Sequence, residues 1–409
     1  MSSQLRFDHT VLDNGLTIIG EYNPRAVSAA VGYMVHAGAR DESPDIAGVS
    51  HFLEHMMFKG NERFSAEDLN RTFDELGAEY NAFTSEERTV YYGAVPADRA
   101  GSLLNLLTEL MQPSLRQEDF DMEKKVILEE IAMYQDRPAQ RLFELANERY
   151  WNGHPLGNSV LGSNDSVGGM QQSAMRAYFD RRYAPGNVYL VLAGNYDWAE
   201  LVASATQATA DWRNYDVTRT KPQPLPAKGY ERVTDATLNR QHTALFAPGL
   251  AVEHPLRFAP SILSNAIGDG SGSRLYWELV DKGLTDSAWL SHEGQEGAGA
   301  FVGYMSAAPA RAEEVLKRYR EVLQQVQEEG ITQEEWRRSQ RKIATSLTFR
   351  AETPLGRLMS FGTYYQTLGT YLSVNEMVEE VMSTPLEAGA QILAGRPFDE
   401  PFVLTLGPT

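Results

Sequence analysis

A proline-rich segment near the middle of the chain constrains the fold more than any other feature. Residues Lys221 to Gly229 read KPQPLPAKG, and the three prolines favour an extended connection between two folded parts. The segment divides the 409 residues into nearly equal halves, and this length suits two domains. The runs that end at Gly194 (LVLAG) and at Gly407 (FVLTLG) resemble each other in composition and in position. We therefore predict two halves of one α+β topology, residues 1–220 and 230–409, joined by a linker at residues 221–229.

Local patterns predict that each half packs helices against a mainly antiparallel sheet. Asn14-Gly15 lies between two apolar runs, which is the strongest short signal for a β-hairpin. A further hairpin is expected at residues 80–95, and strands are expected at residues 26–37, 187–195, 243–246, 287–291, 300–305 and 402–407. Helices are expected at residues 44–59, 65–77, 97–111 and 117–134, and again in the last hundred residues. The aromatic cluster from Phe361 to Tyr371 is expected to lie in a hydrophobic core.

Composition excludes several classes of protein. The chain has no cysteine, so disulfides, thiolate metal sites and cysteine nucleophiles are all excluded, and any metal must bind His, Asp or Glu. The net charge of −18 argues against binding to nucleic acid, because no positive surplus is present to displace counterions. No apolar stretch is long enough to cross a membrane, and the first ten residues lack the features of a secretory signal. We therefore expect a cytoplasmic protein without a membrane partner.

The segment His51-Phe52-Leu53-Glu54-His55 carries the clearest chemistry. In a helix, His51 and His55 at positions i and i+4 lie on one face, so both imidazoles can reach one metal ion. Glu54 lies at the edge of that face, where it can act as a general base on a metal-bound water. The order His-x-x-Glu-His is the inverted form of the zinc-peptidase helix motif.

A zinc site needs a third protein ligand, and a carboxylate commonly complements two histidines. Glu129 and Glu130 are both candidates on a later helix. The helical neighbours of Glu130 are Val126, Ile127, Met133 and Tyr134, all apolar or aromatic, whereas those of Glu129 include Lys125. We therefore predict that Glu130 faces the interior and binds the metal. Glu123, two turns before Glu130, is expected to orient a ligand from behind.

These residues resemble the active-site segments of pitrilysin-type (M16) metallopeptidases, which include the mitochondrial processing peptidase and small bacterial relatives. The similarity extends along residues 48–60 and also includes residues 38–42, 81–85 and 126–130. The separation of 75 residues between His55 and Glu130 matches the distal glutamate ligand of the family, and Glu123 matches its auxiliary acidic position. The resemblance implies one zinc ion, held by the N-terminal half.

The resemblance also implies a fold and a mode of substrate binding. Family members have two homologous α+β halves, and a chain of this size forms half of a clamshell chamber. Peptides bind by adding a strand to a sheet edge, and the matching edge residues here are Asn81, Ala82, Phe83 and Thr84. A β-competent edge can bond to the backbone of a peptide of almost any sequence. We therefore expect a zinc endopeptidase that takes peptides or unfolded polypeptides.

Two other functions remain open at this stage: a catalytically silent M16-like scaffold, and a protein that captures peptides without cleaving them. Silent relatives usually lose the ligand set, whereas this chain keeps His51, Glu54, His55 and Glu130. A protein that only captures peptides would not need Glu54. The motif therefore favours the peptidase.

Active relatives also carry an Arg and a Tyr in the C-terminal half that reach the developing oxyanion. The matching stretch here runs from Glu278 to Ser287 and has Val280 at the Arg position and Asp286 at the Tyr position. Neither side chain can donate a hydrogen bond to an oxyanion at neutral pH. We therefore expect a second M16-like subunit, forming a heterodimer, to supply these donors. The alternative is a homodimer in which Arg274 or Tyr276 takes over the role.

Overall fold

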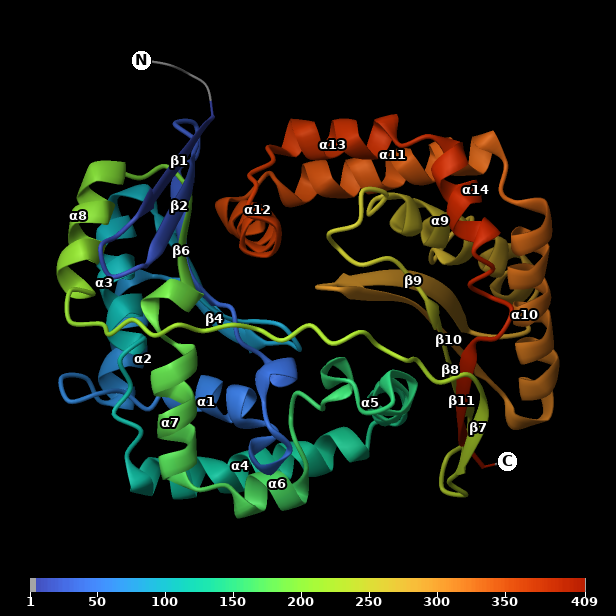
Figure 1. Cartoon of the computed structure of the whole chain (residues 1–409), viewed down its shortest axis with the longest axis horizontal. Helices are drawn as coiled ribbons and strands as arrows, with labels where there is room; N and C mark the ends of the chain where they lie inside the picture. Colours follow the sequence, from blue (N-terminus) through green and yellow to red (C-terminus); the bar gives the residue numbers. More distant parts are fainter. Residues whose placement is uncertain (1–4, 409) are drawn as a thin grey trace. The chain divides into compact units, whose positions relative to one another are not determined.

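The computed structural model describes residues 5–408, which form two compact units. Unit 1 contains the described residues up to Ala132, together with Asn158–Thr220 and Arg350–Leu372. Unit 2 contains Met133–Gly157, Lys221–Phe349 and the described residues from Ser373 onward. The polypeptide therefore crosses between the units several times. Figure 1 shows a sheet with covering helices in each unit.

Unit 1 is built on a six-stranded sheet with the strand order β1-β2-β6-β3-β5-β4. The strands are β1 (Arg6–Val11), β2 (Thr17–Tyr22), β3 (Ser28–Val35), β4 (Glu79–Thr84), β5 (Thr89–Pro96) and β6 (Val188–Gly194). Only β2 and β6 run parallel, and the other neighbours are antiparallel. The central strand β3 is buried along almost its whole length, as its run of small and apolar residues predicts. Strand β4 lies at the edge of the sheet.

Helices cover both faces of this sheet. They are α1 (Val49–Met57), α2 (Ala66–Leu76), α3 (Ala100–Leu110), α4 (Gln117–Gln135), α6 (Asn164–Gly169), α7 (Gln172–Arg182), α8 (Trp198–Ala208) and α12 (Pro354–Leu368). Helix α3 packs on β3 and β5, and α1 contacts β4 and β5. On the other face, Leu358 and Phe361 of α12 pack against a cluster that includes Ile19, Met34 and Val191. Phe361 is fully buried, as expected for a core aromatic residue.

Unit 2 repeats this plan with a five-stranded sheet in the order β7-β11-β8-β10-β9. The strands are β7 (Gly229–Thr234), β8 (Gln241–Pro248), β9 (Ser287–Gln295), β10 (Ala298–Ala307) and β11 (Phe402–Gly407). Its helices are α5 (Pro138–Trp151), α9 (Ala259–Gly268), α10 (Ala312–Glu329), α11 (Gln333–Arg350), α13 (Val374–Ser383) and α14 (Leu386–Ala394). A π-helix spans Tyr276–Val280. The cores on the two faces of the sheet contain Phe301 and Trp336 on one side and Tyr150 and Phe402 on the other.

The two sheets have the same strand pattern. In both, an early strand of the repeat (β2 or β7) pairs in parallel with the last strand (β6 or β11), and an antiparallel hairpin forms the far edge. Strands β2, β6, β3, β5 and β4 correspond in order to β7, β11, β8, β10 and β9. The expectation of two halves of one α+β topology, each with a mainly antiparallel sheet, is therefore confirmed.

The compact units are not the contiguous ranges 1–220 and 230–409 that the proline-rich segment suggests. Helix α5 comes from the first half of the sequence but packs on the second sheet, whereas α12 comes from the second half and packs on the first sheet. Both are the third helix after the edge hairpin of their repeat. The two repeats thus exchange equivalent helices, because each sheet buries its apolar face under a helix from the other repeat.

Residues 221–229, where the prolines predict an extended linker, are bonded to one of the two units. They belong to unit 2, where Lys221 forms ion pairs with Glu253 at 3.3 Å and with Glu296 at 2.9 Å. The Ala227 N–H donates to the carbonyl oxygen of Tyr150 at 2.7 Å, and Gly229 already begins β7. The segment is extended but bonded to unit 2. Among residues 5–408, no helix combines the length and the apolar character needed to cross a membrane.

Candidate metal centre

Helix α1 carries His51, Glu54 and His55, and its start is fixed by backbone geometry. Gly48 has a φ of 89°, and a Cβ atom at this position would come within 2.5 Å of the Leu161 carbonyl oxygen, so only glycine fits. The buried carboxylate of Glu42 accepts hydrogen bonds from the N–H groups of Gly48 at 2.6 Å and Ser50 at 2.7 Å. Because the first amides of a helix lack partners within it, Glu42 caps α1. The local sequence around Glu42 does not predict this role.

His51, His55 and Glu130 come together in unit 1 and could hold a metal ion. Their ligand atoms all lie within 4.8 Å of one another, and Glu130 Oε2 lies 3.9 Å from His51 Nε2 and 3.7 Å from His55 Nε2. Ligands at about 2.0–2.2 Å from a tetrahedral zinc ion are about 3.4 Å apart, so a small inward movement would close the site. Two imidazoles and one carboxylate also form a donor set that suits zinc.

The two histidines differ in their electrostatic environment. Burial lowers the pKa of His51 to about 4, so its imidazole is neutral and ready to bind a metal at physiological pH. Burial also acts to lower the pKa of His55, but the hydrogen bond to Glu123 and the nearby carboxylates outweigh it and raise the pKa. A metal ion that binds His55 must therefore displace a proton that this imidazole holds more tightly than an ordinary histidine does.

Glu123 lies behind the candidate ligands, as its spacing predicts. Its Oε1 atom lies 2.8 Å from His55 Nδ1, and its Oε2 atom lies 2.5 Å from Lys59 Nζ. Burial acts to raise the pKa of Glu123, but the bonds with His55 and Lys59 lower it overall. The ionised carboxylate fixes the imidazole so that Nε2 faces Glu130. Sequence reasoning missed Lys59, although its position one turn after His55 could have drawn attention to it.

Glu54 projects from the same helix toward the edge strand. Its Oε2 atom accepts a hydrogen bond from Thr84 Oγ1 at 2.6 Å. Burial raises the pKa of Glu54, while the Thr84 hydroxyl and the charge of His55 act in the opposite direction. A half-buried carboxylate with a raised pKa, beside a metal-binding cluster, has the properties of a general base.

The structure places the two glutamates of the tandem pair in different surroundings, and only part of the argument from helical neighbours holds. Glu130 lies in the cluster with the two histidines, whereas Glu129 is exposed. Ile127 is fully buried, but Val126 is 47% and Met133 44% exposed. The apolar neighbours of Glu130 therefore do not define one buried face of α4, and their polarity alone would not have been a sufficient guide.

The residues expected to bind the peptide lie on β4, which forms the edge of the sheet and pairs with β5. Exposure alternates along this strand: Asn81 and Phe83 are exposed, and Ala82 and Thr84 are partly buried. The carboxamide oxygen of Asn81 accepts a hydrogen bond from the N–H of Ala82 at 2.8 Å. The open edge is thus present at the place that the resemblance implies.

Val280, Asp286 and Arg274, three of the positions considered from the sequence, are each engaged within unit 2. Val280 packs against the core of unit 2, and Asp286 forms an ion pair with Arg240 at 2.6 Å. Arg274 binds Glu335 through Nε at 2.7 Å and through a second nitrogen at 2.9 Å. Because its guanidinium is already held in this bidentate pair, Arg274 is a poor substitute for a donor that must reach a substrate.

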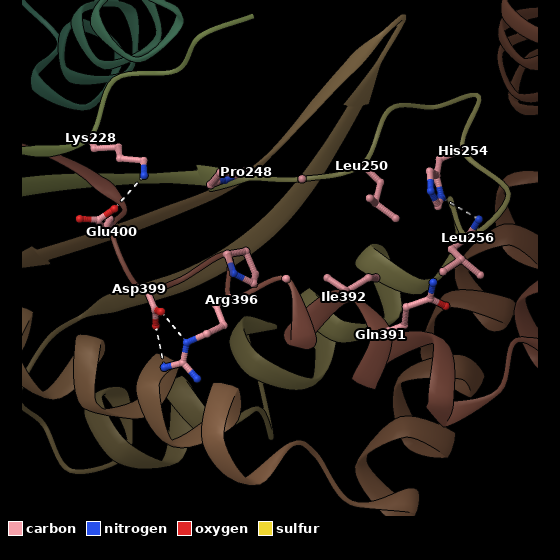
Figure 2. A pocket seen from close by; sticks show the side chains of 13 residues that line it. Lys228, Pro248, Leu250, His254, Leu256, Gln391, Ile392, Arg396, Asp399 and Glu400 are labelled. Carbon is pink, nitrogen blue, oxygen red and sulfur yellow. Dashed lines mark hydrogen bonds and ion pairs between the residues drawn. The ribbon is translucent and has the colours of Figure 1, made fainter.

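The cavity shown in Figure 2 lies in unit 2, whereas the metal cluster lies in unit 1. It has a volume of about 550 Å³, and its charged side chains are paired with each other. Arg396 binds Asp399 at 2.5 Å, and Lys228 binds Glu400 at 2.7 Å. These pairs leave the cavity without a cluster of convergent, catalytically disposed groups like the one on α1.

The fold and the His-His-Glu cluster together define a metallopeptidase-like protein, and comparison with known proteins identifies the family. Residues 17–164 match the insulinase family, peptidase family M16, and residues 170–343 match the peptidase M16 inactive domain. The chain belongs to the M16 family. An uncharacterized zinc protease of Streptomyces coelicolor is 31% identical over 98% of this chain and 89% of its own length. The uncharacterized zinc protease YmxG of Bacillus subtilis is 30% identical over 96% of both chains.

Solved structures support the same fold. A protease from Helicobacter pylori matches with a TM-score of 0.90 at 20% identity, covering 98% of this chain and 100% of the other. A peptidase M16 inactive domain from Pseudomonas fluorescens matches with a TM-score of 0.88 at 19% identity, covering 99% and 98%. The names of the curated relatives and the His-His-Glu cluster agree in indicating zinc as the metal.

Proposed function

We propose that this chain is a zinc endopeptidase that hydrolyses peptides or unfolded polypeptides, with Glu54 as the general base. The observation that carries the proposal is the convergence of His51, His55 and Glu130 beside a half-buried Glu54 on the same helix. Membership of a family of metallopeptidases supports it. An open strand edge next to Glu54 offers a place for an extended peptide.

His51, His55 and Glu130 would hold the zinc ion, and Glu123 would keep the His55 ring in position. When bound, zinc would polarise the scissile carbonyl and lower the pKa of the attacking water. The Glu54 carboxylate takes one proton from that water as its oxygen attacks the carbonyl carbon. The C–N bond then breaks, and the same proton passes to the departing amine nitrogen, so Glu54 returns to its ionised form.

A silent scaffold and a peptide-capturing subunit are the alternatives. Neither needs a complete ligand set, an oriented His55 and a carboxylate held beside the cluster. The second repeat shows the contrast, because it matches the inactive domain of the family and its described residues contain no comparable cluster. We therefore propose that the N-terminal repeat is the catalytic one.

Glu54→Gln tests the general base. All three candidate ligands remain, so zinc content is expected to stay at the wild-type level, whereas kcat should fall by about 10²–10⁴-fold. Glu75→Gln on the surface of α2 provides a control for the loss of one negative charge. Zinc content is measured by atomic absorption, and hydrolysis by mass spectrometry of a digested peptide library. An active Glu54→Gln enzyme would refute the proposal.

We further propose that a second M16-like subunit completes the site as a heterodimer, with a homodimer as the alternative. Val280 and Asp286 lie at the positions where active relatives carry Arg and Tyr. The Asp286 carboxylate forms an ion pair with Arg240. Without these donors, an oxyanion would lose stabilisation that is typically worth about 10²–10³-fold in kcat for each donor.

The isolated chain, loaded with one zinc ion, is therefore expected to hydrolyse peptides weakly, and a partner that carries the Arg and Tyr should raise kcat. Mass photometry of the purified chain distinguishes a homodimer from a monomer that awaits a different partner. Full activity of the isolated monomer would contradict the partner proposal but not the role of Glu54. Enclosure of the reaction in a chamber and a cytoplasmic location stay predictions from the sequence.

A further inference from the structure

The side chain and the backbone of Thr84 face different parts of the structure. Its side chain lies on the face of β4 that is covered by α1 and α2. On this face, Tyr80 stacks on Phe73 of α2 with ring centroids 3.9 Å apart, and the Thr84 hydroxyl donates to Glu54 Oε2 at 2.6 Å. Side chains of a strand alternate between faces, so Phe83 projects to the opposite side. The Thr84 side chain is therefore directed at the candidate base.

The backbone of Thr84 is directed at the open edge of the sheet. The N–H of Ser85 bonds to the Arg88 carbonyl oxygen at 2.8 Å, within the hairpin that joins β4 to β5. In an antiparallel pair, alternate residues turn their N–H and C=O groups toward the partner strand. Asn81 and Phe83 therefore share the orientation of Ser85, and Ala82 and Thr84 turn theirs outward. A peptide strand that adds to this edge would bond to the backbone of Thr84.

We infer that Thr84 is a positioning residue for Glu54 and not a side-chain contact for the substrate. Its hydroxyl holds the Glu54 carboxylate in one orientation, while its backbone belongs to the edge that would hold the peptide. The same residue thus sets the place of the base relative to the scissile bond. This inference rests on the proposed function of Glu54. The hydroxyl has its partner on α1, so the contact with a peptide that the resemblance implies for Thr84 would be made by its backbone.

Thr84→Val and Thr84→Ser separate the two roles. Valine keeps the size and branching of threonine but cannot donate to Glu54, whereas serine keeps the hydroxyl. Loss of one hydrogen bond to a charged group should lower kcat about tenfold, with KM and zinc content unchanged, and serine should restore most of the activity. Thr89→Val is a matched control, because Thr89 lies opposite Thr84 in the ladder but donates to the Ala37 carbonyl oxygen.

Two further measurements do not depend on turnover. Fluorescence anisotropy of a labelled peptide with the zinc-free chain should give the same Kd for wild type and Thr84→Val, because the backbone edge is intact. In thermal unfolding, Thr84→Val should lower Tm by about 2–4 °C in the wild-type background and by much less in a Glu54→Ala background, where the hydroxyl has already lost its acceptor. These measurements decide the inference even if the isolated chain is inactive.

A weaker peptide Kd for Thr84→Val, or a raised KM with unchanged kcat, would show that the side chain binds substrate and would overturn the inference. Equal Tm losses in the two backgrounds would show that Thr84 and Glu54 are not coupled, with the same consequence. Wild-type kcat in Thr84→Val, beside an inactive Glu54→Gln enzyme, would overturn the role of Thr84 alone. An active Glu54→Gln enzyme would instead remove the proposed function itself.

Discussion

Glu123→Gln should weaken zinc binding without removing a candidate ligand. In the wild type, one oxygen of the buried Glu123 carboxylate faces His55 Nδ1 at 2.8 Å and the other faces Lys59 Nζ at 2.5 Å. Glutamine has only one acceptor oxygen, so one of the two partners must face an NH₂ group. If the amide oxygen of the introduced glutamine faces His55, its NH₂ group faces the Lys59 ammonium, and two donors oppose each other. If the amide is flipped, His55 Nδ1 loses its acceptor.

The size of the effect follows from the role of such outer-shell partners. Mutation of a group that orients a metal-binding histidine typically costs about 10–100-fold in affinity, which is about 1.4–2.8 kcal/mol. The estimate should lie toward the upper end here, because only 6% of the Glu123 side chain is exposed and solvent cannot replace the lost charge. The matched control is Glu118→Gln on the exposed first turn of α4, which should leave zinc affinity unchanged.

Zinc affinity is measured by competition with a chromophoric chelator at fixed pH, with thermal unfolding of the zinc-free proteins as a check on folding. The double variant Lys59→Met, Glu123→Gln adds a second test. It removes the ammonium that opposes the amide, so the amide oxygen can stay on His55 and part of the affinity should return. Wild-type affinity in Glu123→Gln would refute the argument that this carboxylate orients His55.

Two further predictions concern a neighbouring ligand and the exchanged helix. Glu130→Gln should lose zinc whereas Glu129→Gln should bind it normally, because only Glu130 lies in the cluster; chelator competition checks both, and equal losses would contradict the assignment. Glu21→Leu should lower the free energy of unfolding in urea by about 3–5 kcal/mol, because it leaves Arg357 of α12 buried and without the carboxylate that binds it at 2.8 Å. The double variant Glu21→Leu, Arg357→Met should recover most of that loss, because it removes the buried charge as well. A cost no greater than that of removing Arg149 from its exposed pair with Glu231 would contradict the buried-pair reasoning.

The metal-binding part of the site could be predicted because its information is local. His51, Glu54 and His55 lie within five residues, and helical geometry alone brings the two imidazoles to one face. Glu130 joins the cluster through a tertiary contact, which helical propensity does not predict. The family resemblance supplied the spacing between His55 and Glu130. The polarity argument for Glu130 would have been weaker by itself, since Val126, its neighbour one turn earlier on α4, is exposed.

Groups that support the site were missed because each acts across the fold. Glu42 resembles any acidic residue in a polar loop before a proline, and nothing in its local sequence shows that its carboxylate caps α1. Lys59 looks like a solvated residue at a helix end until α4 brings Glu123 against it. The hydroxyl of Thr84 could have been assigned to solvent, substrate or protein, and only the packing of β4 on α1 decides among them. Side-chain partners of this kind are set by tertiary structure, which a local pattern does not encode.

The exchange of α5 and α12 shows the same limit at the level of domains. The apolar residues of α12 predict that it is buried, and Phe361 is fully buried, but periodicity does not say which sheet it covers. The proline-rich segment suggested a boundary between two contiguous halves of the chain, because it interrupts the pattern of predicted helices and strands. The core of unit 1 nevertheless needs α12, since Leu358 and Phe361 cover its sheet and Arg357 binds Glu21 on β2. A chain cut after residue 220 would expose that face, so the two repeats depend on each other for folding even though the candidate metal ligands belong to one of them.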